Sequence, residues 1–166
     1  IIATTTANAS NMAIQPYVGT GYTFLNNDID VHFLGLNGGV QFNQYFGAEV
    51  FWNKSVNDLE IDKSLEEFDI KTDTDLQYYG VGLTGKYPLA NNFYAKGIVG
   101  YARTDLNVDV SYEGITASAS EDDSGVIIQA GGGYNFTPNF AAEVAYTHNS
   151  AFDGLNGVNA QLKYNF

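Results

Sequence analysis

Apolar residues alternate with small or polar residues through most of this sequence, and the alternation limits the chain to a β-sheet fold. A period of two places successive side chains on opposite faces of a strand, whereas a helix shows a period of about 3.6. The pattern recurs in eight segments: 14–24, 32–43, 46–54, 78–87, 93–104, 126–136, 140–147 and 158–166. No helical periodicity fits such a succession, so the sequence predicts an all-β protein.

The connections between these segments alternate between short and long. The short ones, 43–45, 88–92 and 137–139, contain the Asn and Pro residues that tight turns use. The long ones, 25–31, 55–75, 105–124 and 149–156, are predicted to be loops. In an up-and-down meander all short turns lie at one end and all long loops at the other. The sequence therefore predicts an eight-stranded antiparallel up-and-down β-barrel.

The two faces of the predicted strands differ in side-chain size, and this difference decides which face points outward. One face carries Phe, Tyr, Trp, Leu and Val, and the other holds most of the 18 glycines together with Gln, Asn, Thr, Glu and Lys. An eight-stranded barrel has a narrow interior, so the small and polar face fits inside. The bulky apolar face would form a large exposed patch in water, but it is stable in lipid. The prediction is a transmembrane barrel rather than a soluble ligand carrier.

Aromatic residues mark both ends of the predicted barrel. The short-turn end holds Phe42, Tyr45, Phe46, Tyr87, Phe93, Phe136, Phe140, Tyr164 and Phe166. The long-loop end holds Tyr22, Phe24, Trp52, Tyr79, Tyr101 and Tyr146. Two such aromatic girdles are typical of a barrel that crosses both membrane–water interfaces.

Charged residues are distributed unevenly along the chain. The net charge of -12 excludes a nucleic-acid-binding protein, and the absence of cysteine excludes a zinc ribbon or a disulfide scaffold. Of 19 acidic residues, only Glu49 and Glu143 fall within predicted strands, and both point inward, as do Lys86, Lys96 and Lys163. Buried charges are stable only when paired, so we expect an ion-pair network inside the barrel, with Glu143 opposite Lys163. These inward charges could line a narrow conduit, but an eight-stranded interior is normally filled by side chains, so the sequence favours a plug over a pore.

The eight strands, the glycine-rich inward faces and the C-terminal aromatic residue resemble the OmpA/OmpX-like outer-membrane β-barrel family. The best-matching stretches are residues 16–22, residues 94–103 and the last strand, which ends in Phe166. The resemblance implies a small monomeric barrel of the Gram-negative outer membrane, without a periplasmic domain, a cofactor or a bound metal. It also implies that Phe166 is part of the signal read by the outer-membrane assembly machinery.

The first residues differ from the rest of the chain. Residues 1–13 are predicted to form an N-terminal tail that precedes a barrel at 14–166. The small residues of Ala7-Asn8-Ala9 fit a signal-peptidase site, so residues up to about 9 are interpreted as the remnant of an export signal. A plain disordered tail is the alternative, because the basic region of a signal peptide is missing.

One constellation offers catalytic side chains. His148 and Ser150 share the outward parity near the loop end of the seventh strand, and a His–Ser pair can deacylate a lipid. Small-barrel lipid A deacylases use His-x-Ser followed by Asn, with a downstream Glu. Here Ala151 follows Ser150, and the last strand contains no Glu. The pair is therefore a weak catalytic candidate, and an interfacial polar pair is the preferred interpretation.

Acidic runs raise the alternative of a divalent-cation site. Glu121-Asp122-Asp123 and the acidic loop 55–75 carry carboxylates that Ca²⁺ or Mg²⁺ prefers. Neither has EF-hand spacing, so solvated loops are the preferred interpretation and no metal site is predicted.

The predicted function is that of a structural outer-membrane component whose acidic extracellular loops mediate adhesion or other surface interactions. The expected partners are outer-membrane lipids and lipopolysaccharide, the assembly machinery and a host or surface ligand, but not nucleic acid. Two alternatives stay open at this point. The first is a narrow small-solute or ion channel, and the second is a lipid A deacylase-like enzyme.

Overall fold

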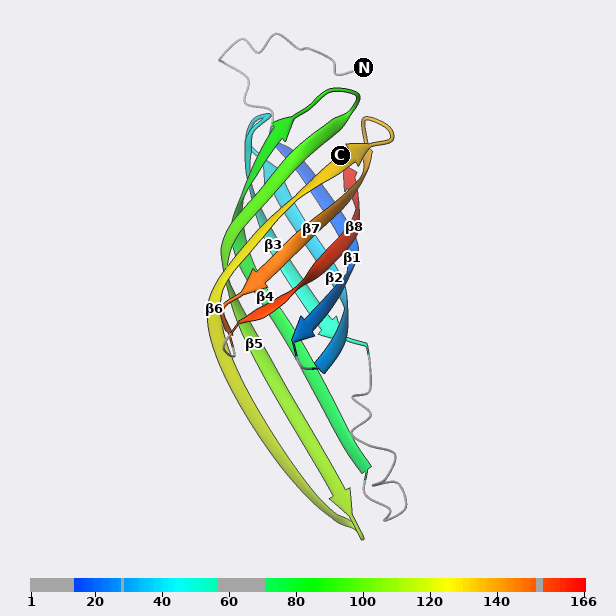
Figure 1. Ribbon diagram of the computed structural model, residues 1–166, viewed down its shortest axis with the longest axis vertical. Helices are drawn as coiled ribbons and strands as arrows, with labels where there is room; N and C mark the ends of the chain where they lie inside the picture. The colour runs from blue at the N-terminus through cyan, green and yellow to red at the C-terminus, as the bar shows by residue number, and fades with distance from the viewer. Residues whose placement is uncertain (1–13, 28, 57–70, 152–153) are drawn as a thin grey trace.

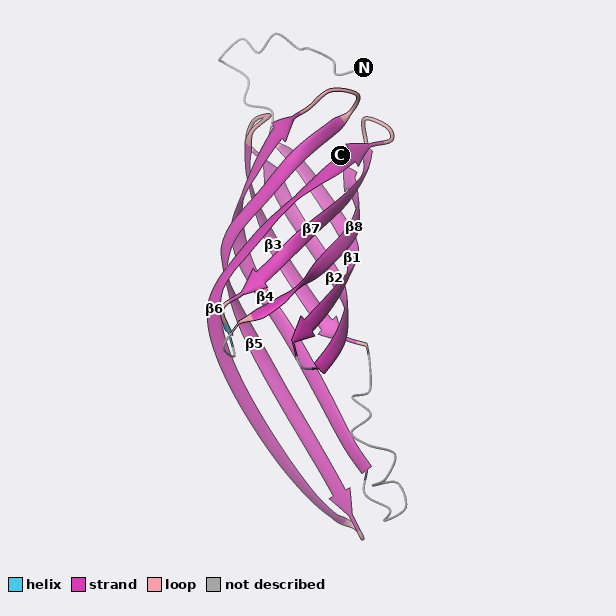
Figure 2. Ribbon diagram, viewed as in Figure 1, coloured by secondary structure: helices cyan, strands magenta, loops and turns pink. Residues whose placement is uncertain are grey.

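The alternating pattern forms strands throughout most of the described part of the chain, which comprises residues 14–27, 29–56, 71–151 and 154–166 of a computed structural model. The strands are β1 (Gln15–Asn27), β2 (Ile29–Gln41), β3 (Phe46–Ser55), β4 (Lys71–Pro88), β5 (Phe93–Tyr112), β6 (Ile115–Asn135), β7 (Phe140–Asn149) and β8 (Leu155–Asn165). Each strand pairs antiparallel with the next, and β8 pairs with β1 (Figure 1; Figure 2). The predicted eight-stranded up-and-down barrel is confirmed.

Closure of the sheet satisfies the backbone groups of the barrel wall without leaving a free edge, as a lipid environment requires. The C-terminal residue Phe166 lies at the end of the barrel that carries the short turns (Figure 1). Within the described residues, no helix is long and apolar enough to span a membrane.

Large apolar side chains point away from the barrel axis, as the strand parity predicts. Leu83, Phe46 and Val50 are 70%, 62% and 57% exposed, whereas the adjacent Thr84 and Glu49 are 4% exposed each. Apolar side chains exposed around a whole barrel are stable in hydrocarbon and not in water. This surface is incompatible with a soluble ligand carrier.

Aromatic rings gather at the two ends of the outer wall. At the short-turn end they form two stacks, Phe93–Tyr134–Phe136 and Phe140–Tyr164–Phe166. Adjacent ring centroids in these stacks are 4.8–5.3 Å apart. Trp52, Tyr79 and Tyr101 are exposed toward the other end. Both girdles thus lie where the interfaces of a bilayer would meet the wall.

The segment 105–124 is not a loop, and this part of the prediction is wrong. β5 and β6 pair as far as Tyr112 and Ile115, and only Glu113 and Gly114 form the turn. Both turn residues have positive φ angles, 46° and 83°, as the favoured two-residue hairpin turns have. The acidic residues of this segment suggest a solvated loop, but its apolar residues alternate with them, and this alternation allows the segment to pair as a hairpin.

The other long connections are also shorter than predicted where the structure describes them. β1 runs to Asn27, β2 begins at Ile29, and β4 begins at Lys71. Residues 57–70 of the predicted second loop and the predicted tail at 1–13 lie outside the described residues. Beyond the barrel, β4, β5 and β6 continue together as a three-stranded sheet (Figure 1).

The barrel interior consists of two different halves. Toward the short turns, the inward side chains are largely polar or charged. Toward the long loops, they form an apolar cluster of Leu25, Val31, Phe33, Phe51, Tyr78, Ala102 and Ile127. The Tyr78 ring packs on Phe33 and Phe51, with centroid distances of 5.2 and 6.3 Å. The expectation of a small and polar interior therefore holds for one half only.

Candidate functional site

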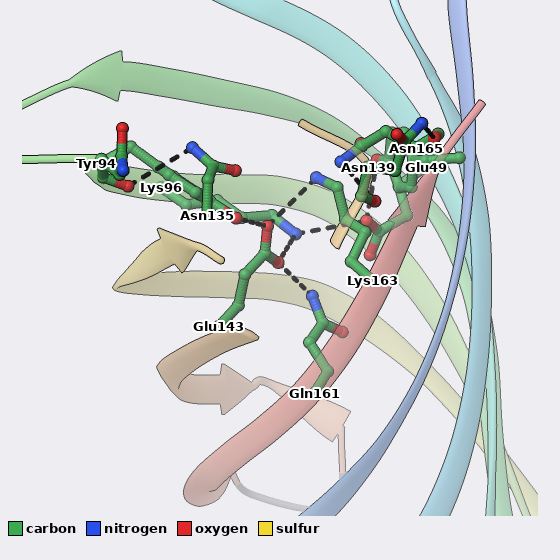
Figure 3. A network of polar contacts seen from close by, with 11 residues as sticks. Glu49, Tyr94, Lys96, Asn135, Asn139, Glu143, Gln161, Lys163 and Asn165 are labelled. Atoms are coloured by element: carbon green, nitrogen blue, oxygen red, sulfur yellow. Dashed lines mark hydrogen bonds and ion pairs between the residues drawn. The ribbon is translucent and has the colours of Figure 1, made fainter. Parts of the chain in front are cut away.

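A buried network of ion pairs occupies the half of the interior nearer the short turns (Figure 3). Its central carboxylate is that of Glu143 on β7, which is 3% exposed. Lys96 Nζ lies 2.6 Å from Glu143 Oε2, and Lys163 Nζ lies 3.1 Å from Oε1. Tyr94 donates a hydrogen bond to Oε1 at 2.5 Å, and Gln161 donates one to Oε2. Four donors satisfy this carboxylate, which a buried charge requires.

Glu49 on β3 supplies the second buried carboxylate. Lys96 Nζ lies 3.3 Å from Glu49 Oε2, and Tyr17 donates a hydrogen bond to the same oxygen at 2.8 Å. Lys96 on β5 thus bridges two carboxylates from β3 and β7. Because these strands are not neighbours in the sheet, the network crosses the interior and ties separate parts of the wall together.

Lys86 is held differently from the other four residues of the predicted network. Its Nζ lies 3.9 Å from the ring centroid of Tyr94. Among the residues that the structure describes, no carboxylate lies within ion-pair distance of Lys86. Lys163 Nζ makes a similar contact, 4.1 Å from the ring centroid of Tyr17. A cation over an aromatic face is stabilised by the charge distribution of the ring, so Lys86 is accommodated without an ion pair.

The predicted pairing of Glu143 directly opposite Lys163 is corrected by the strand register. The cross-strand partner of Glu143 is Gln161, and Lys163 lies opposite Ala141. The register between β7 and β8 differs from the predicted one, which moves the partner of Glu143 by two residues. The long lysine side chain still reaches Glu143 along the diagonal.

Two tyrosines that the sequence analysis missed complete the network. Tyr17 and Tyr94 are each 2% exposed. Their direct cross-strand partners are Gly39 and Gly133. A Cβ atom at Gly39 would clash with the Tyr17 hydroxyl group, and one at Gly133 would clash with the ring of Tyr94. Glycine is therefore needed opposite each ring, and an inward tyrosine paired with an inward glycine is the signal that could have identified them.

The network and the apolar cluster leave little open space along the barrel axis. A cavity with a volume of about 20 Å³ lies between them, lined by residues that include Glu49, Phe51, Tyr78 and Gln161. A cavity of this size holds about one water molecule. The arrangement holds the walls together and leaves no room for a solute at this level.

The two catalytic candidates make separate contacts. His148 Nδ1 is hydrogen-bonded to Asn156 Oδ1 at 2.6 Å, and Ser150 Oγ accepts a hydrogen bond from the backbone N–H of Val126 at 2.8 Å. In the described parts of the chain, no hydrogen bond joins His148 to Ser150. The contact between nucleophile and base that acyl transfer uses is therefore not formed.

The Glu121-Asp122-Asp123 run lies on β6, within a strand and not in a loop. Asp122 Oδ2 lies 3.1 Å from Arg103 Nη2, so one carboxylate of the run already has a cationic partner. Across the described residues, no group of three or more His, Cys, Asp or Glu side chains is placed to hold a metal ion.

The C-terminal residue ends the strand that closes the barrel. The N–H of Phe166 donates a hydrogen bond to the carbonyl of Pro16 at 3.0 Å, and its ring packs against Tyr164. The ring is 63% exposed on the outer wall. The ring of Phe166 is therefore accessible from outside the barrel, as a signal read by the assembly machinery would need to be.

An even-stranded antiparallel barrel with an apolar band, two aromatic girdles and short turns at one end is the form taken by small outer-membrane proteins of bacteria. The comparison with known families agrees. The chain belongs to the outer membrane protein beta-barrel domain family, whose model matches residues 1–166. It is a protein of the bacterial outer membrane and a structural component of the cell surface.

Solved structures with the same fold come from several bacteria. The attachment invasion locus protein Ail of Yersinia pestis is 18% identical, with a TM-score of 0.62 and coverage of 92% of this chain and 97% of that chain. Ail has also been solved in complex with the heparin analogue sucrose octasulfate. The N-terminal β-barrel domain of Pseudomonas aeruginosa OprF is 12% identical, with a TM-score of 0.66 and coverage of 92% and 99%. A major outer membrane protein of Thermus thermophilus is 10% identical, with a TM-score of 0.71 and coverage of 93% and 100%. No curated protein sequence matches the chain.

Proposed function

We propose that the protein is a monomeric surface component that binds basic surfaces of partner proteins through the sheet that β4, β5 and β6 form beyond the barrel. We call this part, residues 75–77, 104–112 and 115–123, the extracellular sheet. Long connections of outer-membrane barrels face the outside of the cell. The observation that carries the proposal is that these three strands stay paired well beyond the barrel wall (Figure 1).

One face of the extracellular sheet is acidic. Alternate residues of a strand share a face, so the side that continues the outer wall holds Asp75, Asp105, Asp109 and Asp122. Arg103 pairs with Asp105 and Asp122 at 3.1 Å each, and Lys54 Nζ lies 3.7 Å from Asp75 Oδ1, so two cations face four carboxylates and the face keeps a net negative charge. An acidic face attracts cationic partners and accelerates their association.

The other face of the extracellular sheet is mainly apolar toward its tip. It continues the inner wall and carries Leu106, Val108, Val110, Tyr112 and Ile115, with Glu121 and Asp123 on the same face nearer the barrel. Tyr112 and Ile115 are 46% and 75% exposed near the tip of the hairpin. Apolar side chains next to charged ones on a projecting element are typical of a protein-binding surface.

The charge of the extracellular sheet also limits the class of ligand. The heparin analogue bound to Ail is a polysulfated anion. Here the acidic face would repel such a ligand, because like charges at short range destabilise a complex. The proposed ligand is therefore a basic protein surface and not a sulfated polysaccharide.

Adhesion of whole cells tests the proposal. A non-adherent laboratory bacterium that displays the full chain is expected to bind an epithelial monolayer several-fold better than the vector control. The combined variant Asp75→Asn, Asp105→Asn, Asp109→Asn and Asp122→Asn should abolish that gain. Protamine should compete because it covers the acidic face, and the cells should not bind immobilised heparin. The double variant Glu113→Gln and Glu121→Gln is the control for loss of negative charge elsewhere on the hairpin, because neither residue lies on the acidic face. Equal adhesion of the Asn variant and wild type, at equal surface levels, would contradict the proposal.

The proposal assigns no catalytic activity to the barrel. Its support is that Ser150 accepts a hydrogen bond from the backbone and His148 bonds to Asn156, so neither is engaged by the other. Fatty-acid release from lipid A is expected to be absent from wild type and from Ser150→Ala alike. Release by wild type that disappears in Ser150→Ala would establish the deacylase instead.

A further inference from the structure

The two buried carboxylates lie in matching stretches of sequence. Residues 38–50 and 132–144 both begin with Gly-Gly, carry a Phe on each side of a short turn, and end in Ala-Glu-Val. This alignment places Glu49 and Glu143 at the same position. In each turn the N–H of the first Phe donates a hydrogen bond to the carbonyl of the second at 2.9 Å. The hairpins β2–β3 and β6–β7 are therefore repeats of one structural unit.

The buried tyrosines extend the repeat to a third strand. In each copy a tyrosine lies opposite a glycine, and that glycine lies opposite a glutamate. The tyrosine hydroxyl group donates a hydrogen bond to the glutamate of the same copy. The first set is Tyr17, Gly39 and Glu49, and the second is Tyr94, Gly133 and Glu143.

A lysine over the tyrosine ring adds a fourth strand to each set. Lys163 Nζ on β8 lies 4.1 Å from the ring centroid of Tyr17, and Lys86 Nζ on β4 lies 3.9 Å from that of Tyr94. The first set therefore spans β8, β1, β2 and β3, and the second spans β4, β5, β6 and β7. Because the two sets together make the whole barrel, the polar half of the interior repeats about a two-fold axis that runs along the barrel.

Gly19 on β1 is the counterpart of Lys96 on β5. Each follows the tyrosine of its set by two residues and lies opposite the lysine of its set. Lys96 Nζ reaches both repeated carboxylates, at 3.3 Å from Glu49 and 2.6 Å from Glu143 (Figure 3). An ammonium group that came from position 19 would enter the same space, and the two like charges would repel each other. The repeat can therefore hold one shared lysine and not two.

The two sets differ at the joints where they meet. Glu143 and Lys163 are two positions apart in the register across β7 and β8, whereas Glu49 and Lys86 are four positions apart across β3 and β4. Lys163 therefore reaches its glutamate, and Lys86 does not reach Glu49. Within the part of the chain that the structure describes, Lys96 is the only cation paired with Glu49. The shared lysine thus satisfies a carboxylate that its own set leaves without a cation.

We infer that the two repeated carboxylates form a site for a single ammonium group that can be supplied from either set. Lys96 supplies it in this chain, and a lysine at position 19 would hold Glu49 and Glu143 in the same way. The bridge is therefore defined by the pair of carboxylates and not by the strand that carries the lysine. This site lies inside the barrel and does not depend on the proposed adhesive role.

Asn37 closes the approach from position 19. It lies opposite Gly19, and its side-chain oxygen would clash with a Cβ atom there. The residue opposite Lys96 is Gly131, which leaves that approach open. Asn37→Gly reproduces the open arrangement in the first set. The remaining close contact of a Cβ atom at position 19, with the carbonyl oxygen of Leu162 at 3.1 Å, is relieved by a shift of a few tenths of an ångström.

The same substitution in two backgrounds tests the inference. In the full chain refolded into vesicles, Lys96→Ala should lower the equilibrium constant for folding about a thousandfold, the factor expected when a buried ion pair is broken from one side. In a background with Gly19→Lys and Asn37→Gly, Lys96→Ala should instead raise the constant about tenfold, because it removes one of two ammonium groups that compete for one site. The resulting triple variant should lie within about tenfold of wild type. Urea titration measures each constant.

A methionine at position 19 is the matched control, because it fills similar space without a charge. The variant with Gly19→Met, Asn37→Gly and Lys96→Ala should fold with a constant about a hundredfold below that of the lysine triple variant. Glu49→Gln adds a readout that depends on the bridge itself. It should lower the constant in wild type and in the lysine triple variant, and raise it in the methionine variant, where Glu49 has lost its cation.

Four outcomes would overturn the inference. They are failure of Lys96→Ala to raise the constant in the Gly19→Lys background, equal constants for the lysine and methionine variants, the same sign of Glu49→Gln in both, and failure of the lysine triple variant to fold. Far-UV circular dichroism in the vesicles verifies folding.

Discussion

The two halves of the barrel interior fill the same narrow space by different physical means. Near the short turns, Glu143 and Glu49 are held by donors from several strands, so the contacts are directional and fix which side chains meet. Near the long loops, Phe33, Phe51 and Tyr78 fill the lumen by packing. A buried ion network depends on each partner being present, whereas packed rings depend on volume. The halves should therefore respond differently to substitution.

Removal of Lys96 is expected to have the largest effect on stability. Lys96→Met leaves Glu49 and Glu143 without the cation that they share. Breaking a buried ion pair from one side costs about 3–5 kcal/mol, so the free energy of unfolding in vesicles should fall by about 4 kcal/mol. Urea titration measures this value. Lys54→Met, at a surface pair, should cost less than about 1 kcal/mol. Equal losses of unfolding free energy in Lys96→Met and Lys54→Met would contradict the expectation that the buried charges contribute more to stability than the exposed ones.

Truncation in the apolar half is expected to come next. Phe33 is fully buried, and its ring packs against Tyr78. Phe33→Ala should lower the free energy of unfolding by about 3 kcal/mol, through lost burial and the cavity that it leaves. Leu83→Ala, at a lipid-facing side chain, should cost much less, because lipid chains fill the space. A smaller loss at Phe33 than at Leu83 would show that the apolar cluster contributes little.

Two buried threonines should respond with opposite signs. Thr23 Oγ1 accepts a hydrogen bond from Asn159 Nδ2 at 2.8 Å, whereas Thr147 Oγ1 has no hydrogen-bond partner in the described part of the chain. Thr23→Val should destabilise the barrel by about 1 kcal/mol, and Thr147→Val should stabilise it by a similar amount of about 1 kcal/mol. The same urea titration measures both. Destabilisation by both variants would indicate that Thr147 has a partner after all.

Ion flow should show the smallest effect, because the two halves seal the lumen in series. Glu143→Ala removes the central carboxylate of the polar half but leaves the rings of Phe33, Phe51 and Tyr78 in place. Planar-bilayer currents are therefore expected to stay at baseline for wild type and for this variant. Ohmic single-channel steps in wild type that change with Glu143→Ala would support the channel alternative.

The barrel fold could be predicted from the sequence. In every strand the alternation of side chains separates an apolar face from a small or polar one, and lipid stabilises the apolar face on the outside. Leu83 and Val50 could be placed outside and Glu49 inside from their positions alone. The hairpin around Glu113 is harder to predict, because the many acidic residues of this segment are typical of a solvated loop. Asp105 and Asp109 alternate with apolar residues, and that alternation describes a strand with one face in solvent.

The sequence predicts which residues take part in the buried network, but not which of them contact one another. Charges on an inward face must find partners, which selects Glu143, Lys96 and Lys163. Parity does not state which inward side chains lie at the same height, since this depends on the register between strands. For that reason the sequence predicts the wrong cross-strand partner for Glu143. It also predicts neither the contact of Lys86 with the Tyr94 ring nor the apolar cluster.

The long β5–β6 hairpin has a practical consequence. The strands carry the Glu113-Gly114 turn about 30 Å past Arg103, from nine residues at about 3.3 Å each. A Cβ atom at Gly114 would meet nothing within 4 Å. Peptide insertions are best tolerated at exposed tips of this kind. A foreign epitope grafted there would be carried about 30 Å from the barrel wall on a paired hairpin, which makes this barrel a scaffold for displaying antigens on living cells.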